Sequence, residues 1–406
     1  MLESILVRQL QARLEDLPLH IKLWNGLEIG DAALAKVKVE LHNRSLLKSL
    51  IGASLGKLAR AYVEGEIDID GRPQDILALG DQLCEGDACR DRKGSDAWKW
   101  WRHTRLRDRK NIQYHYDVSN EFYGLWLDQR RVYSCAYYRA PDMTLEAAQE
   151  AKLDYICRKI ALKPGERLLD IGCGWGGLAF WAAEHYGANV FGITLSESQH
   201  DYVKTQIAAR GLQERVKVRL MDYREVHERE SFDKITSVGM FEHVGRANLT
   251  AYFRKIHDLL KPGGLAMNHG ITAAALKSQG LGSGISEFVD DYVFPGGELP
   301  HASEVMQHAT AGGLECLDAE NLRPHYARTL WDWVERLEAR EAEARRMIGE
   351  KKYRIWRIYM AGSAHAFDQG WLELWQVLAG KPVGGKQPHY PFRRDYMYSA
   401  STSHEQ

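Results

Sequence analysis

The chain has 406 residues, more than one typical domain holds, so two domains are expected. Hydrophobic residues make up 45% and charged residues 27%, as in soluble globular proteins. The formal net charge of −1 argues neither for nor against a nucleic-acid partner, and none is predicted. No apolar run is long enough for a transmembrane helix.

The N-terminal segment and the cysteines indicate a compartment. The first 20 residues contain acidic side chains and lack a cleavable secretory pattern. The six cysteines form no CxxC pair, which argues against a zinc ribbon or a thioredoxin motif, and no metal site is predicted. Reduced thiols in a cytoplasmic protein are the simplest interpretation.

Residues 1–90 are expected to form a small α/β domain. The pattern predicts a helix, two strands joined by a turn at Asn25-Gly26, a helix, a short strand and another helix. Because no cluster of catalytic residue types occurs here, binding is the expected role, either to a lipid or membrane surface or in support of a dimer.

Residues 91–112 form a predicted linker in which basic residues far outnumber acidic ones around Trp98, Trp100 and Trp101. Tryptophan favours the membrane interface, and Lys and Arg favour anionic head groups. A solvated linker whose tryptophans pack on a neighbouring domain explains the same composition.

The strongest pattern is LLDIGCGWGG at residues 168–177, an apolar strand followed by a glycine turn and then by a predicted helix. Glycines allow a tight turn and the close approach of a ligand to the helix N-terminus. The spacing formally fits a dinucleotide motif. However, Asp170 stands two residues before the first glycine, where it can orient the turn or accept from a cationic amino group. This pattern resembles motif I of S-adenosylmethionine methyltransferases. A turn that only joins strand to helix is the alternative.

Five motifs occur in a specific order: HYDVSNEFY, VYSCAYY, LLDIGCGWGG, GITLSESQ and MFEHVG. Together they resemble cyclopropane fatty acid synthases and the related mycolic acid cyclopropane synthases, over roughly residues 110–395. The resemblance implies a class I S-adenosylmethionine methyltransferase domain, α/β and Rossmann-like, over residues 113–395, preceded by the smaller N-terminal α/β domain. It also implies transfer of a methylene from S-adenosylmethionine to the cis double bond of an unsaturated phospholipid acyl chain.

The resemblance assigns a cofactor site along successive strand ends. Tyr133 and Ser134 would cover the methionine end, and Thr194 with Gln199 would take the place of the usual ribose-binding acid. Asp222 and Tyr223 would offer an acceptor and an aromatic wall to the adenine. The predicted cofactor-binding residues are Tyr133, Ser134, Asp170, Gly172, Gly174, Gly176, Thr194, Gln199, Asp222 and Tyr223.

The resemblance also assigns a reaction site that holds bicarbonate. Glu242, His269 and Tyr326 match the side chains that bind this anion, aided by backbone at Cys135 and Ile271. Attack of the alkene on a sulfonium methyl leaves a carbocation, which must lose a proton before the ring can close. A weak base in a dry pocket removes that proton without competing for the methyl group. Phe241 and Tyr292 are further candidates for stabilising the cation.

Two positions depart from the family pattern. Ser363 occupies a position where family members often carry a cysteine, which excludes a thiol nucleophile there. Gly270, between His269 and Ile271, replaces an expected threonine and leaves methyl branching open as an outcome. The alternatives are therefore a fatty-acid C-methyltransferase, a lipid-binding scaffold without activity and, third, a nicotinamide oxidoreductase.

The remaining segments complete the expected architecture. Residues 275–305 are glycine-rich and long for a loop, which favours an acyl-binding lid over a surface loop. Residues 329–347 should form a long charged helix, residues 352–379 apolar helices, and residues 396–406 a flexible tail. A homodimer bound peripherally to the inner face of the cell membrane is expected, because two weak contacts reinforce each other.

Overall fold

The computed structural model describes part of the chain in detail. The described residues are 7–8, 10–12, 14, 17–51, 55–83, 118–276, 292, 299–384 and 390–398. The predicted linker at 91–112, most of the predicted lid and the end of the predicted tail lie outside them. Among the described residues, no helix combines the length and apolarity needed to cross a bilayer.

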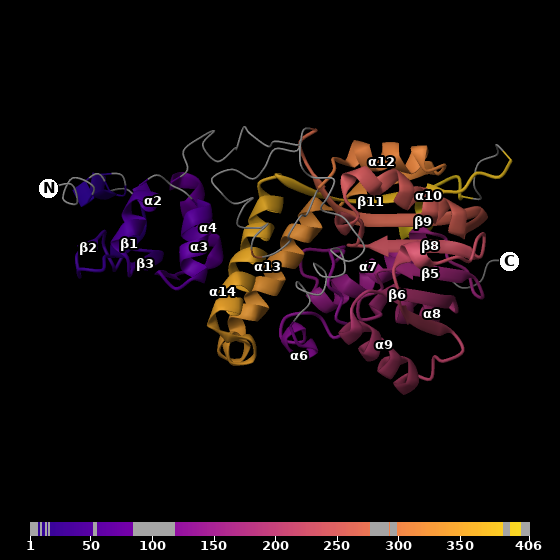
Figure 1. The fold of residues 1–406 in the computed structure, drawn as a ribbon, viewed down its shortest axis with the longest axis horizontal. Helices are drawn as coiled ribbons and strands as arrows, with labels where there is room; N and C mark the ends of the chain where they lie inside the picture. The colour runs from indigo at the N-terminus through magenta and orange to yellow at the C-terminus, as the bar shows by residue number, and fades with distance from the viewer. Residues whose placement is uncertain are drawn as a thin grey trace. The chain divides into compact units, whose positions relative to one another are not determined.

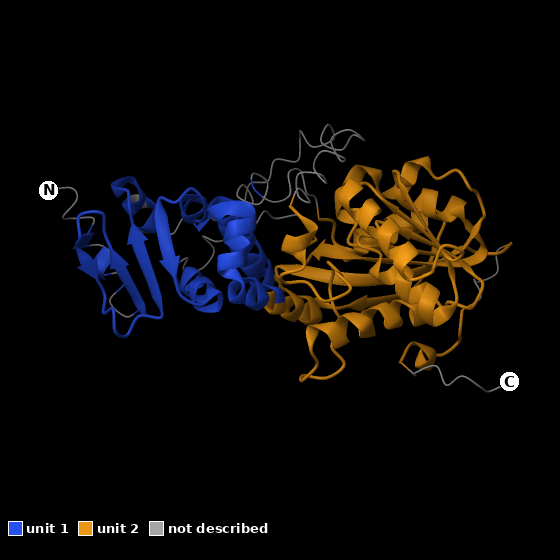
Figure 2. Cartoon of the chain, turned by 90° about the horizontal axis from the view of Figure 1, so that it is seen from below, with its two compact units in different colours: residues 1–98, 279–295, 333–366 blue, residues 99–278, 296–332, 367–406 orange. Residues whose placement is uncertain are grey.

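The chain divides into two compact units, coloured separately in Figure 2. Unit 1 comprises residues 1–98, 279–295 and 333–366, and unit 2 comprises residues 99–278, 296–332 and 367–406. The N-terminal segment thus shares a unit with a helical stretch located more than 200 residues later in the sequence.

Unit 1 contains a four-stranded sheet in the order β2-β1-β3-β4 (Figure 1). Strands β1 (Leu19–Lys22) and β2 (Glu28–Ile29) form an antiparallel hairpin, whereas β1 and β3 (Val37–Leu41) are parallel. The predicted turn is present: Gly26 has a φ of 82°, and the Leu23 amide donates to the Leu27 carbonyl at 2.8 Å. The unit also contains β4 (Ile67–Asp70), α2 (Leu47–Ile51), α3 (Leu55–Val63) and α4 (Pro73–Leu83).

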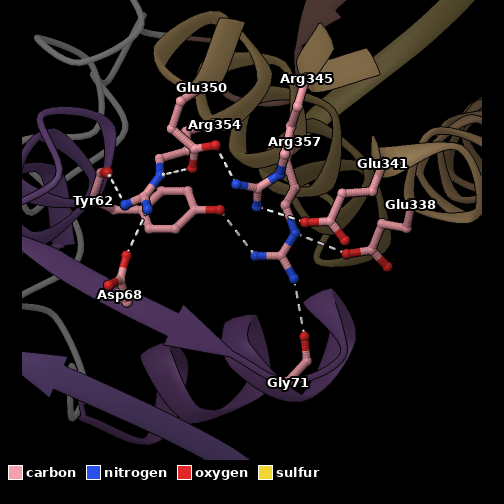
Figure 3. Close-up of polar contacts among 9 residues, drawn as sticks. All are labelled: Tyr62, Asp68, Gly71, Glu338, Glu341, Arg345, Glu350, Arg354 and Arg357. Atoms are coloured by element: carbon pink, nitrogen blue, oxygen red, sulfur yellow. Dashed lines mark hydrogen bonds and ion pairs between the residues drawn. The ribbon is translucent and has the colours of Figure 1, made fainter. Parts of the chain in front are cut away.

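Two arginines of α14 (Glu341–Asp368) connect this helix to the sheet of unit 1 (Figure 3). The Arg354 guanidinium donates to the carbonyls of Tyr62 and Ile67 and forms an ion pair with Asp68 at 2.5 Å. Arg357 donates to the Tyr62 hydroxyl at 3.2 Å and to the Gly71 carbonyl at 3.0 Å. These contacts explain why residues so distant in sequence belong to one unit.

Unit 2 is built on a seven-stranded sheet in the order β10-β11-β9-β8-β5-β6-β7 (Figure 1). The five strands from β9 to β7 are parallel, while β11 is antiparallel to both of its neighbours. This confirms the predicted α/β methyltransferase fold. The strands are β5 (Arg167–Ile171), β6 (Asn189–Thr194), β7 (Val216–Leu220), β8 (Phe232–Val238), β9 (Leu260–Ala273), β10 (Glu315–Asn321) and β11 (Leu372–Gly380).

Helices cover both faces of this sheet and bury two separate apolar clusters. One cluster contains residues of α7 (Leu145–Lys159), α8 (Gly177–Tyr186) and α9 (Glu197–Ala209). The other contains residues of α10 (Leu249–Leu259) and α12 (Ala302–Ala311). Because helices shield both faces, the central strands β5 and β8 are buried along most of their length, as expected for a parallel sheet.

Two expectations about the later elements were wrong. Residues 372–379 lie in β11 rather than in a helix, because a short buried apolar run has no period that separates strand from helix. Strand β9 spans Leu260–Ala273, and β11 pairs with it from Leu265 to Ala273. The predicted helix over 329–347 is divided at Arg340 between α13 (Arg323–Ala339) and α14.

Candidate functional site

A cavity in unit 2 lies where the strand order reverses, since β5 has β6 on one side and β8 on the other. Ligands of open α/β sheets bind at such a switch point, beyond the carboxyl ends of the strands. Nine of the ten predicted cofactor-binding residues line this cavity: Tyr133, Ser134, Asp170, Gly172, Gly174, Thr194, Gln199, Asp222 and Tyr223.

The glycine turn shapes one wall of the cavity. Gly172 and Gly174 line it with φ values of 78° and 56°, in the left-handed region that favours glycine. The tenth predicted residue, Gly176, is not a lining residue and caps α8 with a φ of 84°. A Cβ at Gly176 would lie 2.7 Å from the Phe180 ring, so packing within the fold explains this glycine.

Asp170 ends the apolar run of β5 and faces the cavity from a buried position. Its carboxylate accepts a hydrogen bond from the Thr236 hydroxyl at 2.9 Å. Burial raises the pKa of Asp170 to about 6, against the opposing effects of Thr236 and the Lys152 charge. A buried carboxylate with only partial compensation is suited to a cationic ligand group.

The ends of β6 and β7 provide the next polar groups. The Thr194 hydroxyl donates to Gln199 Oε1 at 2.8 Å, which fixes the amide beside the cavity. Asp222 begins a short 3-10 helix, η4 (Tyr223–Glu225), and accepts from the backbone and guanidinium of Arg224. Asp222 thus holds the turn that presents Tyr223, in addition to facing the cavity.

Helix α7 fastens the segment that carries Tyr133 and Ser134. The Gln149 amide donates to the carbonyls of Val132 and Ser134, at 3.2 and 2.9 Å. Lys152 Nζ donates to the Ser134 hydroxyl at 2.7 Å and also lines the cavity. Lys152 was not among the predicted site residues. Its signal was a lysine three residues after Gln149, on the face of α7 that otherwise carries Leu153 and Ile156.

Burial lowers the pKa of Lys152 to about 8, although the charges of Asp128, Cys135 and Asp170 raise it. Burial thus raises the pKa of the acid Asp170 and lowers that of the base Lys152, so the two pKa values move toward each other. Trp175 is a second lining residue that the sequence analysis missed. Its indole donates to Asn120 Oδ1 at 2.7 Å, and its ring contacts that of Tyr123.

Glu242 lies in the 3-10 helix η5 (Phe241–His243), four residues beyond the end of β8. Its Oε1 accepts from the Ile271 amide at 2.7 Å, whereas Oε2 is buried without a hydrogen-bond partner among the described residues. Burial raises the pKa of Glu242 to about 7. Met240 and His243, which lie close to Glu242 in the sequence, line the cavity.

His269 lies in β9, with 1% of its surface exposed. Its Nδ1 is 3.1 Å from the side-chain nitrogen of Gln376, and its Nε2 is buried with no hydrogen-bond partner among the residues described. Burial holds the pKa of His269 well below its usual value, and the charges of Lys152 and Lys159 act in the same direction. The imidazole is therefore neutral.

The other three predicted catalytic residues connect to this pair through a series of contacts. Ile271 is paired with Leu374 of β11, whose carbonyl accepts from the Leu322 amide at 2.7 Å. The Leu322 carbonyl accepts from the Tyr326 amide at 3.1 Å and lies 4.0 Å from Cys135 Sγ. Glu242, His269, Tyr326, Cys135 and Ile271 thus come from four segments of the chain that adjoin one another within unit 2, with His269 and Ile271 both in β9.

The Phe241 ring packs directly against Gly270, where a side chain would otherwise lie. A Cβ at Gly270 would lie 2.0 Å from the Phe241 ring and 2.9 Å from Glu242 Oε1. The missing side chain is therefore a packing requirement of the segment that carries Glu242. The other expected cation-stabilising residue, Tyr292, belongs to unit 1, where its hydroxyl donates to Glu64 at 2.7 Å.

Comparison with known proteins identifies the family. The family model described as mycolic acid cyclopropane synthetase matches residues 103–377. The chain belongs to this family. A second model, described as a domain of unknown function, matches residues 6–82.

Several known proteins are similar to the chain over nearly all of its length or over about two thirds of it. A probable fatty acid methyltransferase of Pseudomonas putida is 44% identical over 94% of this chain and 96% of its own length. Cyclopropane mycolic acid synthase 1 of Mycobacterium tuberculosis is 37% identical over 67% of this chain and 96% of its own. The crystal structure of mycolic acid cyclopropane synthase CmaA1 complexed with SAH and CTAB has a TM-score of 0.64 and 36% identity, covering 67% of this chain and 98% of that one.

As a member of the mycolic acid cyclopropane synthetase family, the chain is an S-adenosylmethionine-dependent methyltransferase. Its cavity fits that cofactor by the chemistry of its side chains. Asp170 offers a carboxylate for a cationic amino group, Gln199 and Thr194 offer polar atoms for hydroxyls, and Tyr223 offers an aromatic face. Because glycines have no side chain, the glycine turn lets a bound molecule approach the protein backbone closely.

Proposed function

We propose that this methyltransferase adds one carbon to the double bond of an unsaturated acyl chain of a membrane phospholipid and closes a cyclopropane ring. The observation that carries the proposal is the pair of open polar atoms, Glu242 Oε2 and His269 Nε2. Both are buried, and neither has a hydrogen-bond partner within the described part of the chain. Buried polar atoms are rarely left unpaired unless something else binds them.

The donor set at these atoms suits a small oxyanion such as bicarbonate. A neutral imidazole whose Nε2 carries the proton donates one hydrogen bond. Glu242, with a pKa near neutrality, can be protonated and donate another. The Ile271 amide donates to Glu242 Oε1, and the segments that carry Cys135 and Tyr326 adjoin β9 through Leu322 and Leu374. We therefore propose bicarbonate as the bound anion.

In this proposal, one group of residues would orient the cofactor and a second group would bind the anion. Bound S-adenosylmethionine supplies an electrophilic methyl group. Asp170, Tyr133 and Ser134 would orient that cofactor, while Glu242 and His269 would hold the anion that accepts the proton lost before ring closure. The apolar and aromatic surroundings keep water away from the positive charge that develops on the substrate.

Methyl branching is the second candidate, for a specific reason. The relative that is 44% identical over nearly the whole chain is named a probable fatty acid methyltransferase. Gly270 also lies against Phe241 and Glu242, so the site is altered at the position where proton removal is proposed. Loss of the proton from a neighbouring carbon of the substrate would give a branched chain that retains a double bond.

The test is a product analysis with the full chain. Isotopically labelled S-adenosylmethionine is incubated with vesicles of unsaturated phospholipid, and the fatty acids are released and analysed by mass. Ring and branch both add one CH2, so the fatty acids are analysed again after mild hydrogenation. A product that takes up no hydrogen supports the ring. Uptake of one H2 supports branching, and absence of label from every acyl chain overturns both.

Peripheral association with the membrane and a homodimer belong to the same proposal. Vesicle co-sedimentation with and without anionic lipid tests the first, and sedimentation velocity tests the second. Unchanged sedimentation in the presence of vesicles would contradict peripheral binding, and a monomer at working concentration would contradict the dimer.

A further inference from the structure

A series of buried polar contacts begins at Nδ1 of His269, the ring nitrogen opposite the Nε2 that has no partner in the described part of the chain. Gln376 Nε2 is 3.1 Å from His269 Nδ1, and Lys159 Nζ donates to Gln376 Oε1 at 2.8 Å. Lys159 also forms an ion pair with Glu320 at 2.6 Å. Gln376 is 0% and Lys159 is 1% exposed, whereas the Glu320 side chain is 26% exposed. All four residues belong to unit 2.

Lys159 determines which way the Gln376 amide points. A lysine ammonium only donates hydrogen bonds, so the group facing it must be the amide oxygen. The amide NH2 must then face His269. Burial lowers the pKa of Lys159, and the ion pair with Glu320 opposes this shift by favouring the charged form. The orientation of the amide thus follows from donor and acceptor chemistry as well as from the coordinates.

The amide in turn determines where His269 carries its proton. The NH2 group of Gln376 has no lone pair to offer, so His269 Nδ1 must accept, and a proton on Nδ1 would face a second donor. The remaining proton of the neutral ring is therefore on Nε2. This is the buried atom that has no hydrogen-bond partner among the described residues and that belongs to the proposed anion site.

We propose that Lys159 and Gln376 are positioning residues that hold His269 as the neutral tautomer protonated on Nε2, so that the imidazole can only donate toward the bound anion. The inference deepens the proposed function and rests on it for the identity of the anion, but the tautomer is a property of the protein alone.

The same contacts separate two roles that a histidine could take. A ring locked in this way has no lone pair facing the anion, so it orients the anion and does not remove the proton itself. The Gln376 amide fixes the orientation of the His269 ring but cannot relay a proton, because an amide neither gains nor loses a proton near neutral pH. Glu320 therefore anchors Lys159 and is not the end of a proton path.

The experiment measures the tautomer directly. The full chain is labelled with 15N-histidine, and long-range 1H–15N spectra are recorded. The His269 signals are identified by their absence from His269→Asn. In the wild type we expect the pattern of a neutral ring protonated on Nε2, with no titration across the neutral pH range. A pattern with the proton on Nδ1, or a cationic ring, would overturn the inference.

Variants test each link. Gln376→Glu places a carboxylate between Lys159 and His269, so it should draw the proton to Nδ1 or make the ring cationic. Lys159→Met should release the amide and leave a mixture of tautomers. Both should lower kcat on the order of 10- to 100-fold with little change in the KM for S-adenosylmethionine. If the His269 spectrum of Gln376→Glu equals that of the wild type, the proposed role of Gln376 is overturned. If the spectrum of Lys159→Met is unchanged, the proposed role of Lys159 is overturned.

Lys381→Met is the matched control. Lys381 is also buried and also forms an ion pair, with Glu230 at 2.9 Å, but it bonds to Leu260 and not to Gln376. It should lose stability without changing the His269 pattern or kcat beyond the loss of folded protein. A change of His269 pattern in this control would mean that the spectra report general loosening, and would overturn the inference. Failure of the product assay with the wild-type spectra as expected would overturn the proposed function alone.

Discussion

Two half-buried arginines of unit 1 and two buried residues of unit 2 differ in how completely their polar atoms are paired. In unit 1, the three guanidinium nitrogens of Arg354, and likewise those of Arg357, all donate to named partners (Figure 3). In unit 2, Glu242 and His269 each use one polar atom within the fold, and the other has no partner among the described residues.

The difference separates structure from function. A buried charge whose hydrogen-bonding groups are all used stabilises the arrangement of the elements it connects. A buried polar atom that remains open costs free energy in the protein alone, and it is retained where a ligand completes it. The paired arginines therefore explain why α14 belongs to unit 1, and the open atoms of Glu242 and His269 mark the proposed reaction site of unit 2.

The largest effect is expected at an open atom. Glu242→Gln keeps an acceptor for the Ile271 amide but removes the acid, so turnover should fall on the order of 1,000-fold. Binding of S-adenosylmethionine, measured by calorimetry, should stay within about twofold because the cofactor residues are unchanged. Glu228→Gln, at an exposed ion pair with Arg167, is the control and should retain activity. Near-normal turnover of Glu242→Gln would remove this residue from the site.

The second largest effect is a loss of stability, expected when the fully paired Arg354 is replaced. Arg354→Met removes one donor each from the carbonyls of Tyr62 and Ile67 and from the carboxylate of Asp68, which should cost about 2 kcal/mol of local stability. Hydrogen exchange should accelerate in β4 and in the matching part of α14, and not in β5 or β8.

Arg340→Met gives the matched comparison for Arg354. Arg340 is 53% exposed and pairs with Glu343 three residues later, so its loss should cost less than about 1 kcal/mol. Equal acceleration of exchange in both variants would contradict the distinction drawn here.

A smaller effect should appear in the pH dependence of stability. Because burial raises the pKa of Glu242 to about 7, the native protein holds this proton more tightly than the unfolded chain does. The stability gained is fully present below the pKa of the unfolded chain and is lost as the pH rises through that of the folded state. Between about pH 5 and about pH 8, the free energy of unfolding should therefore fall by about 2 kcal/mol more in the wild type than in Glu242→Gln. Parallel stability curves in the absence of ligand would show that this carboxyl is not buried as described.

The smallest effect is expected at the cofactor end of the cavity. Asp170→Asn keeps an acceptor for the Thr236 hydroxyl but removes the charge, so the affinity for S-adenosylmethionine should fall about tenfold. In the wild type, affinity should also weaken as the pH falls below about 6, where Asp170 takes up its proton. Calorimetry across this range should give a flat profile for the variant. A pH dependence equal to that of the wild type would assign the effect to another group.

The glycine turn and the strand ends were readable from the sequence because their signals are local. A run ending in Asp170, followed by glycines and a helix, predicts both the turn and the place of the ligand. The hairpin turn at Asn25-Gly26 was predicted for the same reason, since two residues determine its backbone conformation. Five short motifs in order were enough to indicate the family.

Other features depended on contacts that the sequence does not encode locally. β11 was mistaken for helix because burial on both faces removes the alternation that marks a strand. Lys152, Lys159 and Gln376 had no motif of their own, and their roles follow from the residues that they meet in the fold. The association of α14 with the N-terminal sheet likewise depends on Arg354 and Arg357 meeting partners almost 300 residues away.

The sequence by itself determined the type of fold, the position of the glycine turn and most of the polar residues that line the cavity, because each depends on neighbours along the chain. Only the tertiary structure decided which atoms stay open and which are paired. A hydrogen bond depends on the distance and direction between groups, and folding brings these groups together from segments far apart. That is why His269 could be chosen from the sequence, while the proton on its Nε2 could be assigned only after Gln376 and Lys159 were seen beside it.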